Sequence, residues 1–320
     1  MKRLLALIPI ALLLAGCQTN DLCEYAPGLP WCPAVTNAPD PIPDPEPDPP
    51  PVHTGKVRYC WLRDKNASWR YYDRLLFSAN ERMKEMNLGG EAVPYEVYVA
   101  EIDKLRAEGF TGHIIFTYNI KDGVAFGGKT DIYQNGMGSP VDEAKLSALL
   151  RKIDYAARYM TIMLCPMPDD GGFDYDNMPR ILGHYKVFVE RIVSRYADNP
   201  ARAPHGVVIM QSLEPEEYWN QGQFNQVGAY LNTLTDVEIN AHGTKMHYQW
   251  AQSASWCDVI NLQLDWRKSV SDLIKDVEKV IRSTDKPLDV LEATRGNATS
   301  SHRLGLRAEL DKMDRVKGTP

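Results

Sequence analysis

Short apolar runs alternate with longer segments of helical periodicity from residue 55 to the end of the chain. The clearest run is Val207–Met210, which follows Pro204–Gly206 and precedes Glu214 and Pro215. A continuous run rich in Val and Ile is typical of a strand covered on both faces, as in a parallel sheet. Pro215 cannot donate to a neighbouring strand, so we expect the strand to end before Glu214.

The same pattern recurs along the chain. It predicts strands at Val57–Leu62, His113–Asn119, Tyr159–Cys165, Val207–Met210, Lys245–Trp250, Asp258–Trp266 and Pro287–Glu292. It predicts helices at Trp69–Met86, Tyr95–Glu108, Val141–Tyr155, Arg180–Tyr196, Phe224–Asn240, Val270–Ser283 and His302–Arg315. Strands and helices that alternate with a period of about 40 residues predict right-handed crossovers and a parallel sheet. With so many units, the fold class is a TIM-type (β/α)8 barrel.

The eighth strand is the weak point of this prediction. The sequence ends at Pro320, where that strand should begin, so we expect it to be missing or rudimentary. The barrel should then be open or irregularly closed between strands one and seven. Residues 316–320 could form a stub of strand eight, or Pro51–Gly55 could fill the gap. Otherwise the domain would be truncated and poorly stable.

Residues 1–17 have the pattern of an export signal. Lys2 and Arg3 precede the apolar run Leu4–Leu14, and small residues lead to Cys17. A run of this length is typical of a secretory signal and is too short for a membrane-spanning helix. Leu14–Cys17 also resembles the bacterial lipobox, which implies lipidation at Cys17 and, with the residue that follows, attachment to the outer membrane. The alternative is a plain signal peptide with an incidental cysteine.

Residues 18–54 form a second segment, before the barrel domain at 55–320. Cys23 and Cys32 are close together in an exported segment, so we expect them to form a disulfide. The Pro39–Pro51 tract, with acidic spacers, predicts a stiff polyproline II spacer of about 3.1 Å per residue. A ligand for a proline-binding partner is the alternative.

Composition and charge exclude several classes. The chain has 320 residues, 44% apolar and 24% charged, with a formal net charge of −6 that argues against nucleic acid as a partner. The seven histidines show no metal-binding spacing, so we expect no metal. Gly123–Thr130 matches the phosphate-loop pattern, but no helix is predicted to start after it, so we expect no nucleotide or other cofactor. We expect a monomer.

Several motifs, in order, resemble the retaining glycoside hydrolases of clan A. Phe188–Pro200 with the strand into Glu214 is similar to the clan's fourth strand, and Asp285–Glu292 to its seventh. Tyr98–Phe110 and Trp256–Ile260 resemble the segments that lead into strands two and six. The resemblance spans about residues 56 to 300. It implies that Glu214 is the acid/base and Glu292 the nucleophile. Taken alone, the segment is better explained by a carboxylate at Glu214, Glu216 or Glu217 that favours the start of the next helix.

The chemistry agrees with these roles. Retaining hydrolysis needs two carboxyls about 5–5.5 Å apart, one protonated and one ionised. Residues at the ends of strands four and seven can converge over the barrel mouth. A partly desolvated Glu214 beside a second carboxylate is expected to have a raised pKa.

The sequence departs from the clan at three positions that usually support the two acids. Leu213 stands where the clan has Asn, Ile114 or Ile115 where it has Arg, and Gln263 where His is common. The clan's strand-eight Trp is also missing. Glu214 and Glu292 are present, but several of the residues that usually surround these two acids in the clan are replaced.

Aromatic and amide side chains near the strand ends are candidates for sugar binding. We expect substrate contacts from Trp61, Tyr118, Trp219, Tyr248, Trp250, Gln263 and Trp266. Core packing is the alternative for about half of them. The sequence thus predicts an exported, lipid-anchored glycoside hydrolase acting on an extracellular or envelope glycan. The alternatives are a non-catalytic carbohydrate-binding lipoprotein and a structural envelope lipoprotein on the same fold.

Overall fold

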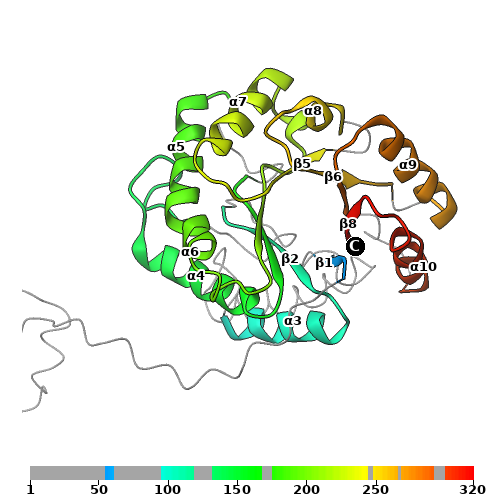
Figure 1. Cartoon of the computed structure of the whole chain (residues 1–320). Helices are drawn as coiled ribbons and strands as arrows, with labels where there is room; N and C mark the ends of the chain where they lie inside the picture. The colour runs from blue at the N-terminus through cyan, green and yellow to red at the C-terminus, as the bar shows by residue number, and fades with distance from the viewer. Residues whose placement is uncertain are drawn as a thin grey trace, which may run out of the picture. The chain divides into compact units, whose positions relative to one another are not determined.

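The computed structural model describes residues 55–60, 95–118, 132–167, 175–243, 248–265, 268–291 and 300–320. All of them belong to one compact unit, Pro49–Pro320. Its strands form a closed barrel in sequence order, and the helices lie around the outside (Figure 1). The structure is therefore a TIM-type (β/α)8 barrel, as the sequence predicts.

Every strand pairs in parallel with its neighbours in sequence order. The strands are β1 Val57–Cys60, β2 Gly112–Phe116, β3 Thr161–Cys165, β4 Val207–Met210, β5 Ile239–Gly243, β6 Val259–Gln263, β7 Leu288–Leu291 and β8 Val316–Thr319. The described helices are α3 Tyr95–Ala107, α4 Glu143–Ala157, α5 Met178–Phe188, α6 Ser194–Ala197, α7 Gln221–Asn232, α8 Tyr248–Ser253, α9 Val270–Ser283 and α10 Ser300–Leu310, with a π-turn η3 at Val189–Val193 and a 3-10 turn η4 at Pro215–Glu217. The predicted helix Trp69–Met86 lies outside the described residues.

Local signals explain where the outer helices begin. The Asp142 side chain accepts hydrogen bonds from two backbone N–H groups at the start of α4. Asn220 and Gln223 form a reciprocal capping box at the start of α7, and Ser269 caps α9. Each cap satisfies N–H groups that have no partner inside the helix, and so fixes the point where the chain turns into it.

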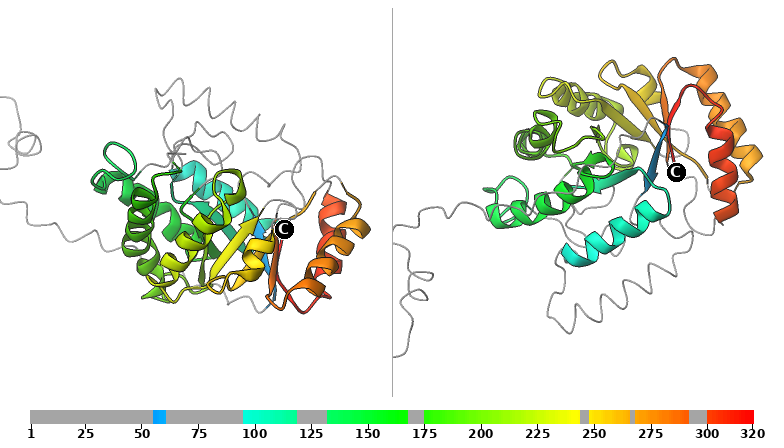
Figure 2. Two further views of the ribbon diagram at one scale, coloured as in Figure 1. Left: turned by 90° about the horizontal axis from the view of Figure 1, so that it is seen from above. Right: turned by 60° about the horizontal axis from the view of Figure 1, so that its bottom comes forward.

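Strand eight is present and closes the barrel. β8 pairs in parallel with β1 and with β7, and it lies between them near the C-terminus (Figure 2). The possibility that residues 316–320 form this strand is confirmed, whereas the expectation of an open barrel is wrong. The closure is irregular, because the β7 ladder shifts register between Leu288 and Asp289. Thr319 also accepts a hydrogen bond of 2.7 Å from Arg58 of β1, which ties the strand in place.

The predicted fifth strand is wrong. β5 is Ile239–Gly243, and the segment from Tyr248 to Ser253 is helix α8. The preceding helix ends at Asn232, eight positions before its predicted end at Asn240. Ile239 and Ala241 pack in the layer between the strands and the helices, so the residues between and after them face the barrel interior. The polar character of those interior residues hides the strand in the sequence.

The barrel interior has an apolar side and a polar side. The apolar side comes mostly from β1 to β4 and consists of Tyr59, Ile114, Phe116, Met163, Cys165, Met210, Leu213 and Leu291. Strands β5, β6 and β7 instead supply the buried polar residues Asn240, His242, Asn261 and Asp289. Buried polar groups are costly unless they are hydrogen-bonded. Four of them on one side of the interior therefore indicate that a functional site lies on this side of the barrel.

Two glycines make room for the Tyr59 ring in the interior. A Cβ atom at Gly112 of β2 would lie 2.6 Å from the ring, and one at Gly318 of β8 would lie 2.5 Å from it. A side chain at either position would therefore collide with Tyr59. Gly318 is thus needed for the last strand to close against β1, which explains why β8 has so little apolar signal.

The packing of α7 gives a first prediction. A Cβ atom at Gly228 would overlap the ring of Trp256, which packs 5.0 Å from Phe224 of the same helix. We expect Gly228→Ala to lower the free energy of unfolding by about 1–3 kcal/mol, because the ring must move. The matched control is Gly183→Ala in α5, where a Cβ meets no heavy atom within 4 Å. It should gain up to about 1 kcal/mol from helix propensity. Equal melting temperatures for the two variants would contradict the packing of Trp256 on α7.

Candidate active site

Glu214 lies beyond the C-terminal end of β4 in a strained backbone conformation. Its φ of 45° and ψ of 50° place it in the left-handed region, and among the described residues it is the one residue other than glycine with positive φ. This conformation costs an L-residue roughly 1–2 kcal/mol. Strain of this kind persists where the surroundings hold it in place, and it is concentrated at functional sites.

Glu214 forms three hydrogen bonds with His242, Glu217 and Gln263, all among the residues that the structure describes. Its N–H donates to Nδ1 of His242 on β5 at 3.4 Å, and its C=O accepts from the N–H of Glu217 at 3.0 Å. Its Oε1 accepts from Nε2 of Gln263 at 2.7 Å. Glu214 as a whole is 8% exposed. Backbone and carboxyl are therefore both fixed, and the fixing groups come from β5, β6 and the turn η4.

These residues meet at the C-terminal end of the barrel strands. Gln263 is the last residue of β6, and His242 is the last but one of β5. Leu291 is the last residue of β7, and Glu292 follows it in the sequence. Catalytic groups of TIM barrels stand at this end. Glu292 itself lies outside the described residues, as do Trp61, Trp266, Cys17, Cys23 and Cys32, so their assigned roles stay predictions.

His242 is neutral in this site. Burial lowers its pKa to about 3, because an imidazolium would lose its hydration there. Nδ1 faces the N–H of Glu214 and must accept from it, so the ring proton is assigned to Nε2. His242 is not among the site residues predicted from the sequence. The alternation of apolar and polar residues from Ile239 to Gly243 was the signal that could have found it.

A second carboxyl is buried deeper in the polar side. Asp289 of β7 is 2% exposed, and its Oδ2 accepts from Nδ2 of Asn240 at 2.9 Å. Burial, and to a smaller extent the nearby charge of Glu238, raise the pKa of Asp289 to about 7. Lys317 and the donors Asn240 and Gly318 act in the opposite direction but are outweighed. Asp289 is not among the site residues predicted from the sequence.

The four described aromatic residues predicted to bind sugar pack into the layer between strands and helices. Tyr118, Trp219 and Tyr248 are buried there, and Trp250 is partly buried. The Tyr118 hydroxyl accepts from the N–H of Met137 at 3.2 Å, and the Trp250 ring lies 5.6 Å from that of Phe224. Their surroundings favour the alternative of core packing. Gln263 is the predicted substrate-binding residue that the structure brings into direct contact with Glu214.

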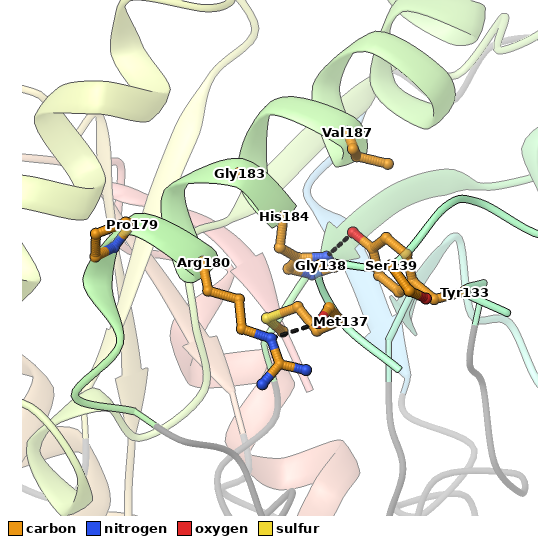
Figure 3. Close-up of a pocket in the computed structure, with 9 residues that line it drawn as sticks. All are labelled: Tyr133, Met137, Gly138, Ser139, Pro179, Arg180, Gly183, His184 and Val187. Carbon is orange, nitrogen blue, oxygen red and sulfur yellow. Dashed lines mark hydrogen bonds between the residues drawn. The ribbon is translucent and has the colours of Figure 1, made fainter. Parts of the chain in front are cut away.

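A separate cavity of about 510 Å³ lies beside helix α5 (Figure 3). His184 forms part of its wall, with Nε2 donating to the carbonyl of Pro166 at 2.9 Å and Nδ1 accepting from the Tyr133 hydroxyl at 2.8 Å. Burial lowers the pKa of His184 to about 4, so the ring is neutral. The Arg180 guanidinium reaches into the cavity and donates from Nε to the Met137 carbonyl. Both ring nitrogens of His184 are thus bonded to the protein.

Within the described ranges, no three His, Cys, Asp or Glu side chains gather at a point where they could hold a metal ion. Cys165 and Cys257 are buried and carry free thiols, as expected for small apolar core residues. Among the helices that the structure describes, none is both long enough and apolar enough to cross a membrane.

Comparison with known proteins adds a likeness in fold. No protein-family model matches the sequence, and no curated protein sequence is similar to it. A GH113 beta-1,4-mannanase is similar in structure, with 11% identity over 72% of this chain and 84% of that chain, at a TM-score of 0.46. The GH53 catalytic domain of Ignisphaera aggregans has 12% identity over 84% and 85% of the two chains, at 0.47. A glycoside hydrolase family 5 structure from Bacteroides vulgatus has 13% identity over 55% of this chain and 38% of its own, at 0.38.

These structural neighbours are glycoside hydrolases with eight-stranded parallel barrels. At such identities and TM-scores the likeness concerns the barrel and assigns no activity, because one barrel fold hosts many chemistries. Function must therefore be argued from the residues around Glu214.

Proposed function

We propose that this protein is a glycoside hydrolase that cleaves a glycan with retention of configuration, with Glu214 as acid/base and Glu292 as nucleophile. The observation that carries the proposal is the state of Glu214. It is buried, strained and hydrogen-bonded to Gln263 at the catalytic end of a closed (β/α)8 barrel. A carboxylate at the start of a helix needs neither burial nor a left-handed backbone, and a core carboxylate does not need the left-handed backbone.

The reaction proceeds in two steps. Glu214 protonates the glycosidic oxygen while the Glu292 carboxylate attacks the anomeric carbon, so the bond to the leaving sugar breaks as the bond to the enzyme forms. Glu214, now ionised, then takes a proton from water, and the water oxygen displaces Glu292 from the anomeric carbon. The enzyme returns to its starting state, and the two inversions give net retention.

One observation favours a second candidate, a carbohydrate-binding protein without hydrolysis. Leu213 is 1% exposed and packs into the apolar side of the barrel interior. The clan has an asparagine at this position, so an amide that could reach the sugar is replaced by a core side chain. Ile114 and Ile115, at the place of the clan's arginine, are buried as well. These changes would weaken hydrolysis more than binding of a sugar.

A substrate screen separates these possibilities. Residues 49–320, which form one compact unit, are incubated with a panel of polysaccharides and chromogenic glycosides, alongside Glu214→Gln and Glu292→Gln variants. We expect wild-type hydrolysis of a polysaccharide that both variants lose, with binding of the same glycan retained. Binding with no cleavage by the wild-type protein would favour the second candidate. If the wild-type protein neither binds nor cleaves any glycan of the panel, the remaining alternative is a structural envelope lipoprotein.

We further propose that the protein is exported and lipid-anchored at Cys17, with the acidic proline tract as a spacer. Cys17→Ala is expected to move the protein from the membrane to the soluble fraction, because one lipidated residue supplies the attachment. Fractionation followed by immunoblotting measures this. Cys23→Ala, in the adjacent segment, is the matched control and should stay with the membrane. Retention of the Cys17→Ala protein in the membrane would contradict the anchor.

A further inference from the structure

The backbone of Glu214 depends on one acceptor from a neighbouring strand. Its N–H points to Nδ1 of His242 at 3.4 Å, and His242 is 1% exposed on the polar side of the barrel interior. A buried N–H without an acceptor costs roughly 1–3 kcal/mol. Loss of this acceptor would add to the strain of a left-handed residue, so the loop after β4 would tend to relax.

The carboxyl of Glu214 depends on a second neighbour. Gln263 Nε2 donates to Oε1 at 2.7 Å, a short distance for an amide donor. His242 pairs in register with Asn261 of β6, two residues before Gln263, so both contacts to Glu214 come from adjacent strands. The Gln263 amide therefore fixes the orientation of the Glu214 carboxyl plane, and it makes the two oxygens inequivalent because it donates to Oε1.

We propose that His242 and Gln263 are positioning residues for Glu214. His242 holds the peptide N–H and with it the left-handed backbone, and Gln263 holds the carboxyl. This inference rests on the proposed function and deepens it. Because Oε1 accepts from the amide, the transferable proton of the acid is assigned to Oε2, which is then the oxygen that delivers it to the glycosidic bond.

Two substitutions at His242 separate positioning from packing. His242→Asn places an amide oxygen close to the position of Nδ1, so it can still accept from Glu214. His242→Leu has similar bulk and no acceptor. We expect His242→Leu to lower kcat by about 10–100-fold with KM within about threefold, since displacement of a catalytic group by about 1 Å has effects of this size. His242→Asn should restore kcat to within about threefold of the wild type. Equal losses in both variants would overturn the role of His242.

Gln263 has a different signature. Gln263→Leu removes a donor that stabilises the carboxylate, so the alkaline limb of the kcat/KM profile should shift to higher pH. Thermal unfolding of the same variant is measured alongside. A fall in stability with an unchanged pH profile would show that Gln263 has a structural role alone and would overturn the proposal for this residue.

Nuclear magnetic resonance tests the geometry without any substrate. In the full chain with 15N-labelled histidine, the His242 signals at neutral pH should show a neutral ring with the proton on Nε2. With uniform 15N labelling, the Glu214 amide signal should move in His242→Leu and stay close to its wild-type position in His242→Asn. A charged ring, or a proton on Nδ1, would overturn the inference. If no glycan is cleaved, the proposed function fails, while these signals still decide whether His242 holds the Glu214 backbone.

Discussion

Replacement of Glu214 with glutamine is expected to lower kcat on an unactivated glycan by about 10²–10⁴-fold, the usual contribution of a general acid. Glutamine keeps the size of the side chain but has no proton of suitable acidity for the leaving oxygen. Activity on an aryl glycoside with a good leaving group should fall much less in the first step, because that leaving group needs no proton. Steady-state and burst-phase rates on the two kinds of substrate measure the difference.

Glu217→Gln is the matched control for this experiment. Glu217 is an exposed carboxylate in the same turn, and its link to Glu214 is through its backbone N–H. Its substitution should leave kcat within about twofold. A Glu214→Gln enzyme that keeps full activity on unactivated glycans would remove Glu214 from the mechanism, whatever the strain of its backbone.

Asp289→Asn is expected to stabilise the protein at alkaline pH. Burial raises the pKa of Asp289 from 3.8 to about 7 in the folded chain. Between these values the folded chain holds a proton that the unfolded chain has lost, so this group makes stability fall as pH rises. A shift of about 3 units corresponds to a cost of up to about 4 kcal/mol above pH 7. Asparagine cannot ionise, so the variant escapes this cost.

Urea unfolding at several pH values measures the effect. The gain of Asp289→Asn over the wild type should be largest near pH 8 and vanish near pH 4. His184 and His242 have lowered pKa values, which make stability fall as pH drops below their unfolded value of 6.5, but they act equally in both proteins and cancel. Asp236→Asn, at an exposed position, is the control. A gain independent of pH would contradict a buried, neutral Asp289.

The elements that the sequence predicts well are those whose apolar pattern reflects burial directly. β4 at Val207–Met210 and α9 at Val270–Ser283 have the bounds that periodicity predicts. β5 was missed because its interior residues, Asn240 and His242, are polar. The sequence signal for β8 is weak because Lys317 and Gly318 interrupt its apolar run. Gly318 is needed at its position because a side chain there would collide with the Tyr59 ring.

The site residues also divide into those that the sequence pattern predicts and those that depend on how the barrel packs. Glu214 could be found because a proline ends a buried strand beside it. Gln263 was singled out through the sequence resemblance at its position, while the predicted strand ran on to Trp266 and the observed strand ends at Gln263.

The alternation from Ile239 to Gly243 could have placed His242 on a strand. Its contact with Glu214 could not be predicted, since that contact depends on which strand lies next to β4 in the barrel. The packing of Trp219 and Trp250 in the layer between strands and helices could not be predicted either. An aromatic side chain at a strand end can face the barrel mouth or turn back into that layer.

The proposed retaining hydrolysis depends on two carboxylates, Glu214 after β4 and Glu292 after β7. The most direct test follows the anomeric proton signals of the product by nuclear magnetic resonance in the first minutes of cleavage of the best glycan found. With a retaining mechanism we expect the first anomer to appear to have the configuration of the substrate. The other anomer should appear later by mutarotation. The inverted anomer as the first product would contradict a retaining mechanism.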